Sequence, residues 1–326
     1  MNPKLVFIGS GNITPYHIEA ARKMNFDLSG IVGRDYSKSA LHLSEKYNIP
    51  YFEKMSYLLD QVKFDCIVVT TPPQETLKII SKLAKTNVPI LVEKPASLSP
   101  HSLASILHLQ NIFVAYNRRF YNTVQDLKVI NSQSPGFFNF YVSEVTFNEG
   151  DLLESIEQAL YTNTVHMFDL IKFIVGDYEL VNIEYHKLNH NLVSYIYQNS
   201  NFIGILVVAF NSKRNTSIEF ENSFLNISIL PLEKSQKYNN LQVIEPCADS
   251  NIRKYVPVWE SSGGAIIEEP SDLKPGFFGQ YEEFYEVVEK GIRHTNLASL
   301  NDAHHALLKA DIVFSKFRVL SNHFVV

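Results

Sequence analysis

Residues 4–14 read Lys-Leu-Val-Phe-Ile-Gly-Ser-Gly-Asn-Ile-Thr, an apolar run followed by two glycines. The run Leu5–Ile8 predicts a strand buried on both faces, because no polar residue interrupts it. Pro15 comes next, and proline is favoured in the first turn of a helix. A helix expected over Pro15–Met24 therefore begins where the glycines end. Strand, glycine turn and helix in this order predict a phosphate-binding turn.

The two glycines of this turn have different roles. Gly9 permits the tight turn out of the strand, and Gly11 lets a pyrophosphate approach the helix N-terminus. Free N–H groups and the helix dipole favour anions there. Thr14 replaces a third glycine, whose position mainly serves helix–strand packing. The alternative is a glycine turn in an unrelated α/β fold. The residues expected to bind a dinucleotide here are Gly9, Ser10, Gly11, Asn12 and Ile13.

Strand and helix patterns alternate through residues 1–117. Continuous apolar runs of this length are typical of parallel strands, and amphipathic segments separate them. The alternation predicts a doubly wound α/β sheet, that is, a dinucleotide-binding Rossmann domain. The expected strands are Leu5–Ile8, Leu28–Val32, Cys66–Val69, Ile90–Val92 and Ile112–Ala115, and the later helices are Ser39–Tyr47, Gln74–Lys85 and Pro100–Leu109.

The pattern changes after Tyr116, where residues 118–326 are expected to form an α+β domain for substrate binding and oligomerisation. Alternating apolar residues predict a mostly antiparallel open sheet with one wet face. Residues 232–262 are polar and are expected to be loops, and the closing helix is able to pack back on the first domain. The expected helices are Asn122–Ile130, Thr164–Val175, Gln280–Lys290 and Asp302–Leu320; the strands are Leu180–His186, Val193–Tyr197, Phe202–Phe210, Ser217–Glu221 and Leu225–Leu230, with a hairpin turn at 198–201.

Composition narrows the class of protein. The chain has 326 residues and a net charge of -5, which favours neither nucleic acid nor an acidic membrane as a partner. Its two cysteines, Cys66 and Cys247, predict neither a disulfide framework nor a cysteine metal cluster. No zinc or iron spacing of histidines and carboxylates is present. With a strand at Lys4–Ile8 and no targeting pattern, the expected location is cytoplasmic.

The end of the second strand bears on the choice of cofactor. There the sequence reads Gly33-Arg34-Asp35. An acidic residue at this place binds the ribose hydroxyls of NAD, whereas an arginine suits the 2′-phosphate of NADP. Register places Arg34 or Gly33, rather than Asp35, at the deciding position, so NADP is expected rather than NAD. The alternative for Arg34 is an ordinary solvated charge.

The chain contains the motifs Gly9-x-Gly11-x-x-Thr14-x-x-His17, Thr71-Pro72-Pro73, Glu93-Lys94-Pro95 and Asn117-Arg118-Arg119-Phe120, followed by His166-Met-Phe-Asp169 and Ser299-Leu-Asn-Asp302-Ala303. The first four occur in the order and spacing of the Gfo/Idh/MocA oxidoreductase family, and the last two resemble motifs of its C-terminal domain. Glucose–fructose oxidoreductases and inositol dehydrogenases belong to this family, and the resemblance spans nearly the whole chain.

The resemblance implies roles for residues along the chain. Lys94 would be catalytic, because a lysine at the carboxyl edge of the sheet can offset alkoxide charge, and Pro95 would shape the nicotinamide site. Beside the glycine turn and Arg34, the cofactor contacts would be Thr71, Pro72, Glu93, Lys94 and Asn117. The substrate contacts would be Arg119, Tyr161, Thr162 and Asp169. A solvent-facing lysine in a proline-ended loop is the alternative for Lys94.

His166 and Asp169 share one face of an apolar helix. A buried polar group needs a partner or a cavity, and histidine is the natural acid/base for a hydroxyl–carbonyl conversion. We expect His166 to be catalytic and Asp169 able to orient it. A structural histidine that bonds a backbone carbonyl is the alternative.

The chain departs from the family where an aspartate often stands four residues before this histidine, because that residue is Thr162. Two residues before His166, where the family usually has a glycine, this chain has Thr164. After Thr71-Pro72-Pro73, where the family commonly has a histidine, it has Thr76. Either Tyr161 or Asp169 could compensate, or the protein could lack turnover.

The leading hypothesis is an NAD(P)-dependent oxidoreductase that acts on a hydroxyl or carbonyl of a sugar, cyclitol or nucleotide-sugar. The alternative is a non-catalytic NAD(P)-binding regulatory or scaffold protein, and a weaker third is an enol-ether or imine reductase. A homodimer or homotetramer is also expected, because the visible helices are too few to cover both faces of the second sheet. The candidate interface positions are Val207, Ala209, Ile227 and Ile229.

Overall fold

The structure is a computed structural model of the chain. It describes residues 2–145, 152–186, 191–247, 249–259, 266–268, 273–291 and 295–322. The chain divides into two compact units, each of which takes two segments. Unit 1 contains Met1–Phe120 and Pro270–Asp311, and unit 2 contains Tyr121–Glu269 and Ile312–Val326.

Unit 1 is built around a sheet whose strand order is β16-β6-β5-β4-β1-β2-β3. Apart from β16, which pairs antiparallel with β6, the strands are parallel. The order reverses between β1 and β4, which is the switch point where doubly wound sheets bind their ligands. The predicted Rossmann fold is therefore confirmed. The strands are β1 (Lys4–Ile8), β2 (Asp27–Val32), β3 (Tyr51–Phe52), β4 (Cys66–Val69), β5 (Ile90–Val92), β6 (Ile112–Val114) and β16 (Ala298–Ser299).

Helices flank this sheet. Residues of β1 and β4 are buried on both faces, as continuous apolar runs predict. Helix α9 comes from the second segment of unit 1, and its residues Phe277, Tyr281 and Phe284 join the core formed by β1 and α1. The helices of unit 1 are α1 (Thr14–Lys23), α2 (Lys38–Tyr47), α3 (Met55–Gln61), α4 (Pro73–Leu83), α5 (Pro100–Ala104) and α9 (Phe277–Lys290), with 3-10 turns η1 (Ala84–Thr86) and η2 (Asn117–Phe120). Helix α10 (Leu300–Asn322) belongs to both units.

Unit 2 contains a second sheet, in the order β14-β13-β12-β11-β7-β10-β9-β8, with β15 beside β13. Strands β7 and β10 are parallel and the other pairs are antiparallel, so the predicted mostly antiparallel sheet is confirmed. Its strands are β7 (Phe137–Glu144), β8 (Glu179–His186), β9 (Asn191–Gln198), β10 (Asn201–Phe210), β11 (Ser217–Glu221), β12 (Asn226–Ile229), β13 (Lys234–Ile244), β14 (Lys254–Trp259) and β15 (Ile266–Glu268).

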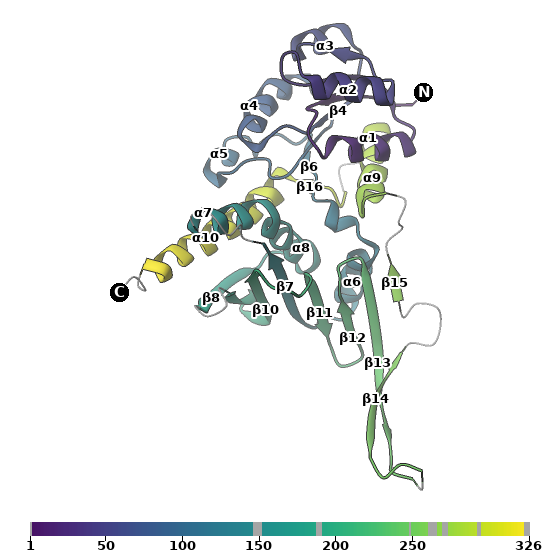
Figure 1. The fold of residues 1–326 in the computed structure, drawn as a ribbon, viewed down its shortest axis with the longest axis vertical. Helices are drawn as coiled ribbons and strands as arrows, with labels where there is room; N and C mark the ends of the chain where they lie inside the picture. Colours follow the sequence, from purple (N-terminus) through teal and green to yellow (C-terminus); the bar gives the residue numbers. More distant parts are fainter. Residues whose placement is uncertain are drawn as a thin grey trace. The chain divides into compact units, whose positions relative to one another are not determined.

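The helices of unit 2 lie on one face of this sheet (Figure 1). Phe138 and Phe140 of β7 are buried, whereas Phe137 and Tyr141, which alternate with them, remain accessible. Ala209, Ile227 and Ile229, three of the expected interface positions, are each 1% exposed. They are therefore buried within the unit and are not interface positions. The helices are α6 (Asn122–Gln133), α7 (Leu152–Ala159), a π-helical turn η3 (Leu160–Thr164) and α8 (Val165–Val175).

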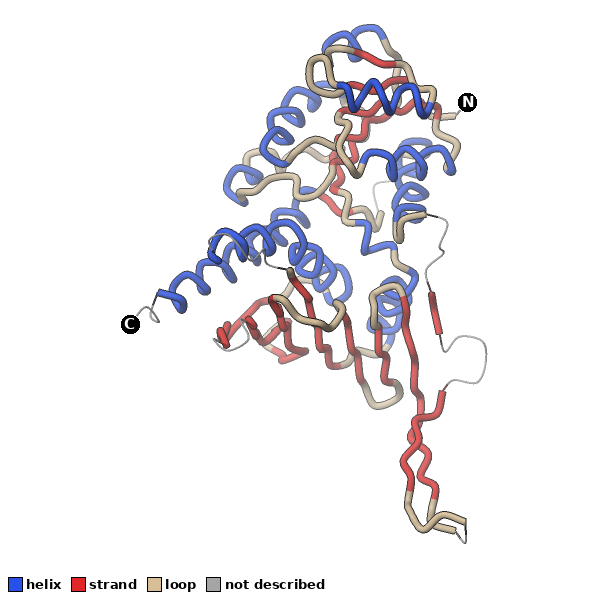
Figure 2. The backbone as a smooth tube through the Cα atoms, viewed as in Figure 1, coloured by secondary structure: helices blue, strands red, loops and turns tan. Residues whose placement is uncertain are grey.

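One prediction for this unit is wrong. Within residues 232–262, expected as loops, the structure has the paired strands β13 and β14. Only Ser235–Tyr238 of β13 pair with β12, and beyond them the two strands continue as a two-stranded ribbon (Figure 2). Leu241 and Tyr255 on this ribbon are exposed. Because neither face is consistently buried, the ribbon lacks the alternation from which strands are predicted.

Candidate cofactor and active site

Backbone geometry explains the first glycine of the turn after β1. Gly9 has φ +119°, and a Cβ at this position would lie 2.5 Å from the backbone of Thr70. Any side chain there would therefore separate β1 from the end of β4. A Cβ on Gly11 would meet its first neighbour only at 3.7 Å, so the protein itself does not forbid one. Gly11 instead keeps the helix N-terminus open to a ligand.

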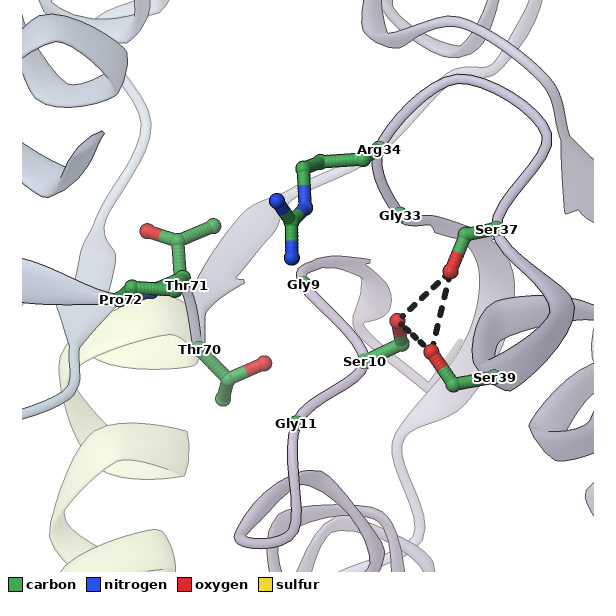
Figure 3. A pocket seen from close by; sticks show the side chains of 10 residues that line it. All are labelled: Gly9, Ser10, Gly11, Gly33, Arg34, Ser37, Ser39, Thr70, Thr71 and Pro72. Carbon is green, nitrogen blue, oxygen red and sulfur yellow. Dashed lines mark hydrogen bonds between the residues drawn. The ribbon is translucent and has the colours of Figure 1, made fainter.

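A pocket of about 370 Å³ lies at this turn (Figure 3). It sits where the carboxyl ends of β1, β2 and β4 meet, which is the expected position for a dinucleotide. The predicted cofactor residues Arg34, Thr71 and Pro72 line it, whereas Asp35 is not among the lining residues. The full lining is Gly9, Ser10, Gly11, Gly33, Arg34, Ser37, Ser39, Thr70, Thr71 and Pro72.

Three serine hydroxyls meet beside Arg34 in this pocket. Ser10 Oγ lies 2.7 Å from Ser39 Oγ and 3.2 Å from Ser37 Oγ, and the last two are 3.0 Å apart. Gly33 makes this possible, because a Cβ there would lie 2.4 Å from the Cβ of Ser37. Figure 3 shows the Arg34 guanidinium extending from the loop after β2 toward the glycine turn. One cation and three hydroxyls suit a small oxyanion.

Glu93 ends β5 at the same edge of the sheet, and its carboxylate is held inside unit 1. Its Oε1 lies 2.8 Å from Nε2 of His17, and its Oε2 accepts the backbone N–H of Lys94 at 3.0 Å. His17 Nδ1 lies 2.9 Å from the hydroxyl of Tyr281. His17 and Tyr281 are fully buried, while the side chain of Lys94 is half-buried. Glu93 therefore contacts the protein rather than presenting a free carboxylate to the pocket.

A second lysine lies near this edge. The ammonium of Lys274 stands over the rings of Tyr16, at 5.0 Å, and Phe277, at 5.4 Å. Partial desolvation lowers the pKa of Lys274, the charge of Glu93 acts to raise it, and that of Arg118 to lower it. Phe277 also contacts His17 edge-on at 4.9 Å between ring centroids. The edge at Glu93 is thus a cluster of charged and aromatic side chains from both segments of unit 1.

Two of the predicted site residues are engaged in hydrogen bonds within unit 1. The amide of Asn117 donates to the carbonyl of Pro275 at 2.9 Å. The guanidinium of Arg119 donates to the carbonyl of Asn296 at 3.1 Å and lies 3.5 Å from a carboxylate oxygen of Asp302. Arg119 is 4% exposed. These bonds join η2 to the returning segment of the chain.

The remaining predicted residues belong to unit 2. His166 and Asp169 lie on α8 and are buried. Tyr161 and Thr162 lie in the π-helical turn that precedes this helix, a feature frequent at functional sites. The Thr162 hydroxyl donates to the carbonyl of Gln158 at 2.6 Å. Burial of the Tyr178 hydroxyl raises its pKa well above the ordinary value, and the nearby charge of Asp169 raises it further.

A buried carboxylate that the sequence did not reveal lies at the start of α8. Glu144, 3% exposed at the end of β7, accepts a hydrogen bond from the Asn163 amide at 3.0 Å and another from the Thr164 hydroxyl. Both donors come just before His166. Because β7 was not predicted, no sequence signal placed Glu144 near this helix.

Residues of the pocket fit a dinucleotide. The glycine turn lies at the N-terminus of α1, Gly11 leaves room for the pyrophosphate, and Arg34 with the three serines lies where the adenosine ribose is bound in this fold. Among the described residues, no cluster of histidines, cysteines and carboxylates could hold a metal ion. No described helix is long and apolar enough to span a membrane.

The strand order and glycine turn define a dinucleotide-binding Rossmann domain. Residues 4–120 match the model of the Gfo/Idh/MocA family, an oxidoreductase family with an NAD-binding Rossmann fold. The resemblance inferred from the motifs is confirmed over residues 4–120.

Solved structures with the same fold cover both units. A protein of Desulfitobacterium hafniense that is described as an NADPH-dependent oxidoreductase is 14% identical with a TM-score of 0.75, and the match covers 97% of this chain and 95% of that protein. A protein of Sinorhizobium meliloti that is described as a myo-inositol dehydrogenase is 16% identical with a TM-score of 0.69, and the match covers 97% of this chain and 98% of that protein. The UDP-N-acetylglucosamine 3-dehydrogenase GnnA of Acidithiobacillus ferrooxidans is 12% identical with a TM-score of 0.70, and the match covers 97% of each chain. No curated protein matches the sequence.

Proposed function

We propose that this protein is an NADP-dependent oxidoreductase acting on a hydroxyl or carbonyl of a sugar, cyclitol or nucleotide-sugar. The observation that carries the proposal is the pocket at the switch point, with Lys94 at the same carboxyl edge. Structures of the same fold that are described as acting on myo-inositol and on UDP-N-acetylglucosamine support this substrate class. A bound nicotinamide supplies the group that accepts or donates a hydride.

Selection of NADP rests on the side chains beside the adenosine ribose. Arg34 lines the pocket, and the hydroxyls of Ser10, Ser37 and Ser39 converge next to it. A 2′-phosphate would accept hydrogen bonds from both kinds of group, and bonds between charged partners are about twice as strong as neutral ones. NAD offers ribose hydroxyls instead, which an aspartate or glutamate would bind. The exposed Asp35 lies outside the lining residues.

Calorimetry with NADP⁺, NADPH, NAD⁺ and NADH tests this choice. Arg34→Ala should weaken NADPH binding about 10- to 100-fold, corresponding to ~1.5–3 kcal/mol for a hydrogen bond to a charged group, and leave NADH binding unchanged. Lys38→Ala is the matched control, since it removes the same charge from the exposed start of α2 outside the pocket. Tighter binding of NADH than NADPH by the unmodified protein would contradict the choice of NADP. Binding of none of the four would contradict the proposed function itself.

Lys94 and His166 are the residues proposed to act on the substrate. Lys94 would hydrogen-bond the reacting oxygen and stabilise negative charge on it, and His166 would take or give its proton. Tyr161, Thr162, Asp169 and Arg119 are proposed to orient the substrate. Lys94 belongs to unit 1 and His166 to unit 2.

A homo-oligomer is part of the proposal. Phe137, Tyr195 and Phe202 form an aromatic patch on the face of the second sheet opposite Phe138 and Phe140. Their exposed fractions are 42%, 37% and 46%. Val207, one of the expected interface positions, lies on this face and is half-buried. Clustered exposed aromatics are typical of protein interfaces.

A further inference from the structure

A chain of buried hydrogen bonds leads from α9 to the backbone of Lys94. Tyr281 contacts Nδ1 of His17 at 2.9 Å, Nε2 of His17 contacts Glu93 Oε1 at 2.8 Å, and Glu93 Oε2 accepts the N–H of Lys94 at 3.0 Å. His17 and Tyr281 are 0% exposed, and the side chain of Glu93 is 13% exposed. Three separate segments of unit 1 thus meet at one carboxylate.

The direction of each hydrogen bond follows from the groups involved. A carboxylate only accepts hydrogen bonds, so Nε2 of His17 carries the hydrogen that faces Glu93. Burial first, then the nearby Cys66 and Glu93, raise the pKa of Tyr281 well above its ordinary value. Its hydroxyl therefore keeps its proton, and with a neutral imidazole it donates to Nδ1. Both ring nitrogens of His17 then have a matched hydrogen-bond partner, which fixes the imidazole in one tautomer and one orientation.

These bonds leave Glu93 little freedom. Both of its carboxylate oxygens are engaged, one by a ring that cannot rotate without breaking two bonds and one by the backbone of the next residue. The bond to the Lys94 N–H anchors the main chain at the point where the lysine side chain leaves the edge of the sheet. A side chain with four rotatable bonds gains precision when its backbone is held in this way.

We propose that His17 is a positioning residue for Lys94: through Glu93 it fixes the backbone from which the lysine reaches the reacting oxygen. This inference rests on the proposed function for its catalytic meaning. His17 itself is not among the residues that line the pocket, and it is buried between Phe277, Tyr281 and Glu93. Loss of the imidazole should therefore displace Lys94 without weakening the cofactor site.

NMR of protein labelled with ¹³C at lysine Cε measures this displacement without any substrate. The Lys94 signal is assigned by its loss in Lys94→Arg. His17→Leu, which removes both hydrogen bonds, should shift or broaden the Lys94 signal more than those of the other lysines. His17→Gln retains a side-chain N–H of similar reach and should restore most of the original signal. Calorimetry should show NADPH affinity unchanged in both variants.

Two tyrosine variants provide a matched comparison. Tyr281→Phe removes the hydroxyl that fixes His17 and should move the Lys94 signal in the same direction as His17→Leu. Tyr47→Phe removes another buried hydroxyl that contacts α1, 3.0 Å from the Glu19 carboxylate, and should leave the Lys94 signal in place. If His17→Leu fails to fold, this pair decides the question. Equal effects of the two tyrosine variants would overturn the proposal.

Kinetics with a substrate of the proposed class adds a second readout. His17→Leu should lower kcat about 10- to 100-fold, as small misplacements of a reacting group do, while KM changes little. An unmoved Lys94 signal in folded His17→Leu would overturn the role of His17, even with turnover demonstrated. A moved signal in a protein that turns over no substrate would support the role of His17 and contradict the proposed function.

Discussion

Lys94 and His166 have different environments, and their variants should differ accordingly. Lys94→Met should leave cofactor affinity nearly unchanged and lower kcat, because the lost charge matters mainly in the transition state. His166→Asn should lower the rate roughly 10²- to 10⁴-fold if the imidazole transfers the proton. Steady-state kinetics with calorimetry of NADPH binding measures both effects. Full turnover in both variants would refute the proposed roles.

The residue at position 162 allows a sharper test of the same mechanism. Thr162→Asp places a carboxylate four residues before His166, the position at which the resemblance drawn from the sequence implies one. A faster rate would mean that this arrangement is latent in the fold. An unchanged rate would mean that another group already has this role, and Glu144, buried beside Thr164, is then the first candidate. Glu144→Gln keeps the shape of the side chain but removes its charge. A fall in the reaction rate of this variant would assign the role of the carboxylate to Glu144.

Single residues could be predicted wherever local backbone chemistry determines their role. Gly9, Gly11 and Arg34 follow strands directly, so their place at the carboxyl edge could be read from the chain. Ser37 and Ser39 beside Arg34, the bond between His17 and Tyr281, and the buried Glu144 could not. Each depends on a partner from a distant segment, and no local pattern specifies which distant side chains meet.

Helices and strands were predicted well where one face is buried. Strands β10 and β11 and helices α6 and α9 follow clear apolar patterns. The ribbon of β13 and β14 was missed because its side chains are exposed on both faces, and β7 was missed between two helical patterns. The predicted turn at 198–201 is present, with Asn199 and Ser200 at φ 49° and 66°.

That turn provides a stability prediction. Positive φ at both central residues is the type I′ geometry, for which Asn-Gly is the favoured pair. Ser200→Gly should raise the free energy of unfolding by about 0.5–1 kcal/mol, because glycine adopts the left-handed conformation without the steric cost of a Cβ atom. The same change at Ser81, exposed on helix α4, should instead lower it. Urea unfolding of the two variants measures the difference, and a loss of stability in Ser200→Gly would show that the turn is formed differently.

Assembly of whole molecules should depend on the aromatic patch of Phe137, Tyr195 and Phe202. Phe202→Asp places a charge at its centre and should convert the expected dimer or tetramer to smaller species, because burying an unpaired charge is costly. Phe224→Asp is the matched control, since Phe224 is 75% exposed between β11 and β12. Light scattering at micromolar concentration gives the mass of each variant. A monomeric unmodified protein would contradict the proposed assembly.

The path of the chain through unit 1 sets an order of events during synthesis. The ribosome completes residues 1–120 first, yet Phe277, Tyr281 and Phe284, which fill the core beside β1 and α1, emerge only after residues 121–269. At about 5–20 residues per second, the nascent Rossmann domain waits several seconds or more with part of its apolar core uncovered. During that interval the apolar surface of β1 and α1 that α9 later covers is exposed, and His17 lacks the Tyr281 hydroxyl that fixes it. The hydrogen-bond chain from Tyr281 to the backbone of Lys94 therefore forms only after residues 121–269 have been synthesised.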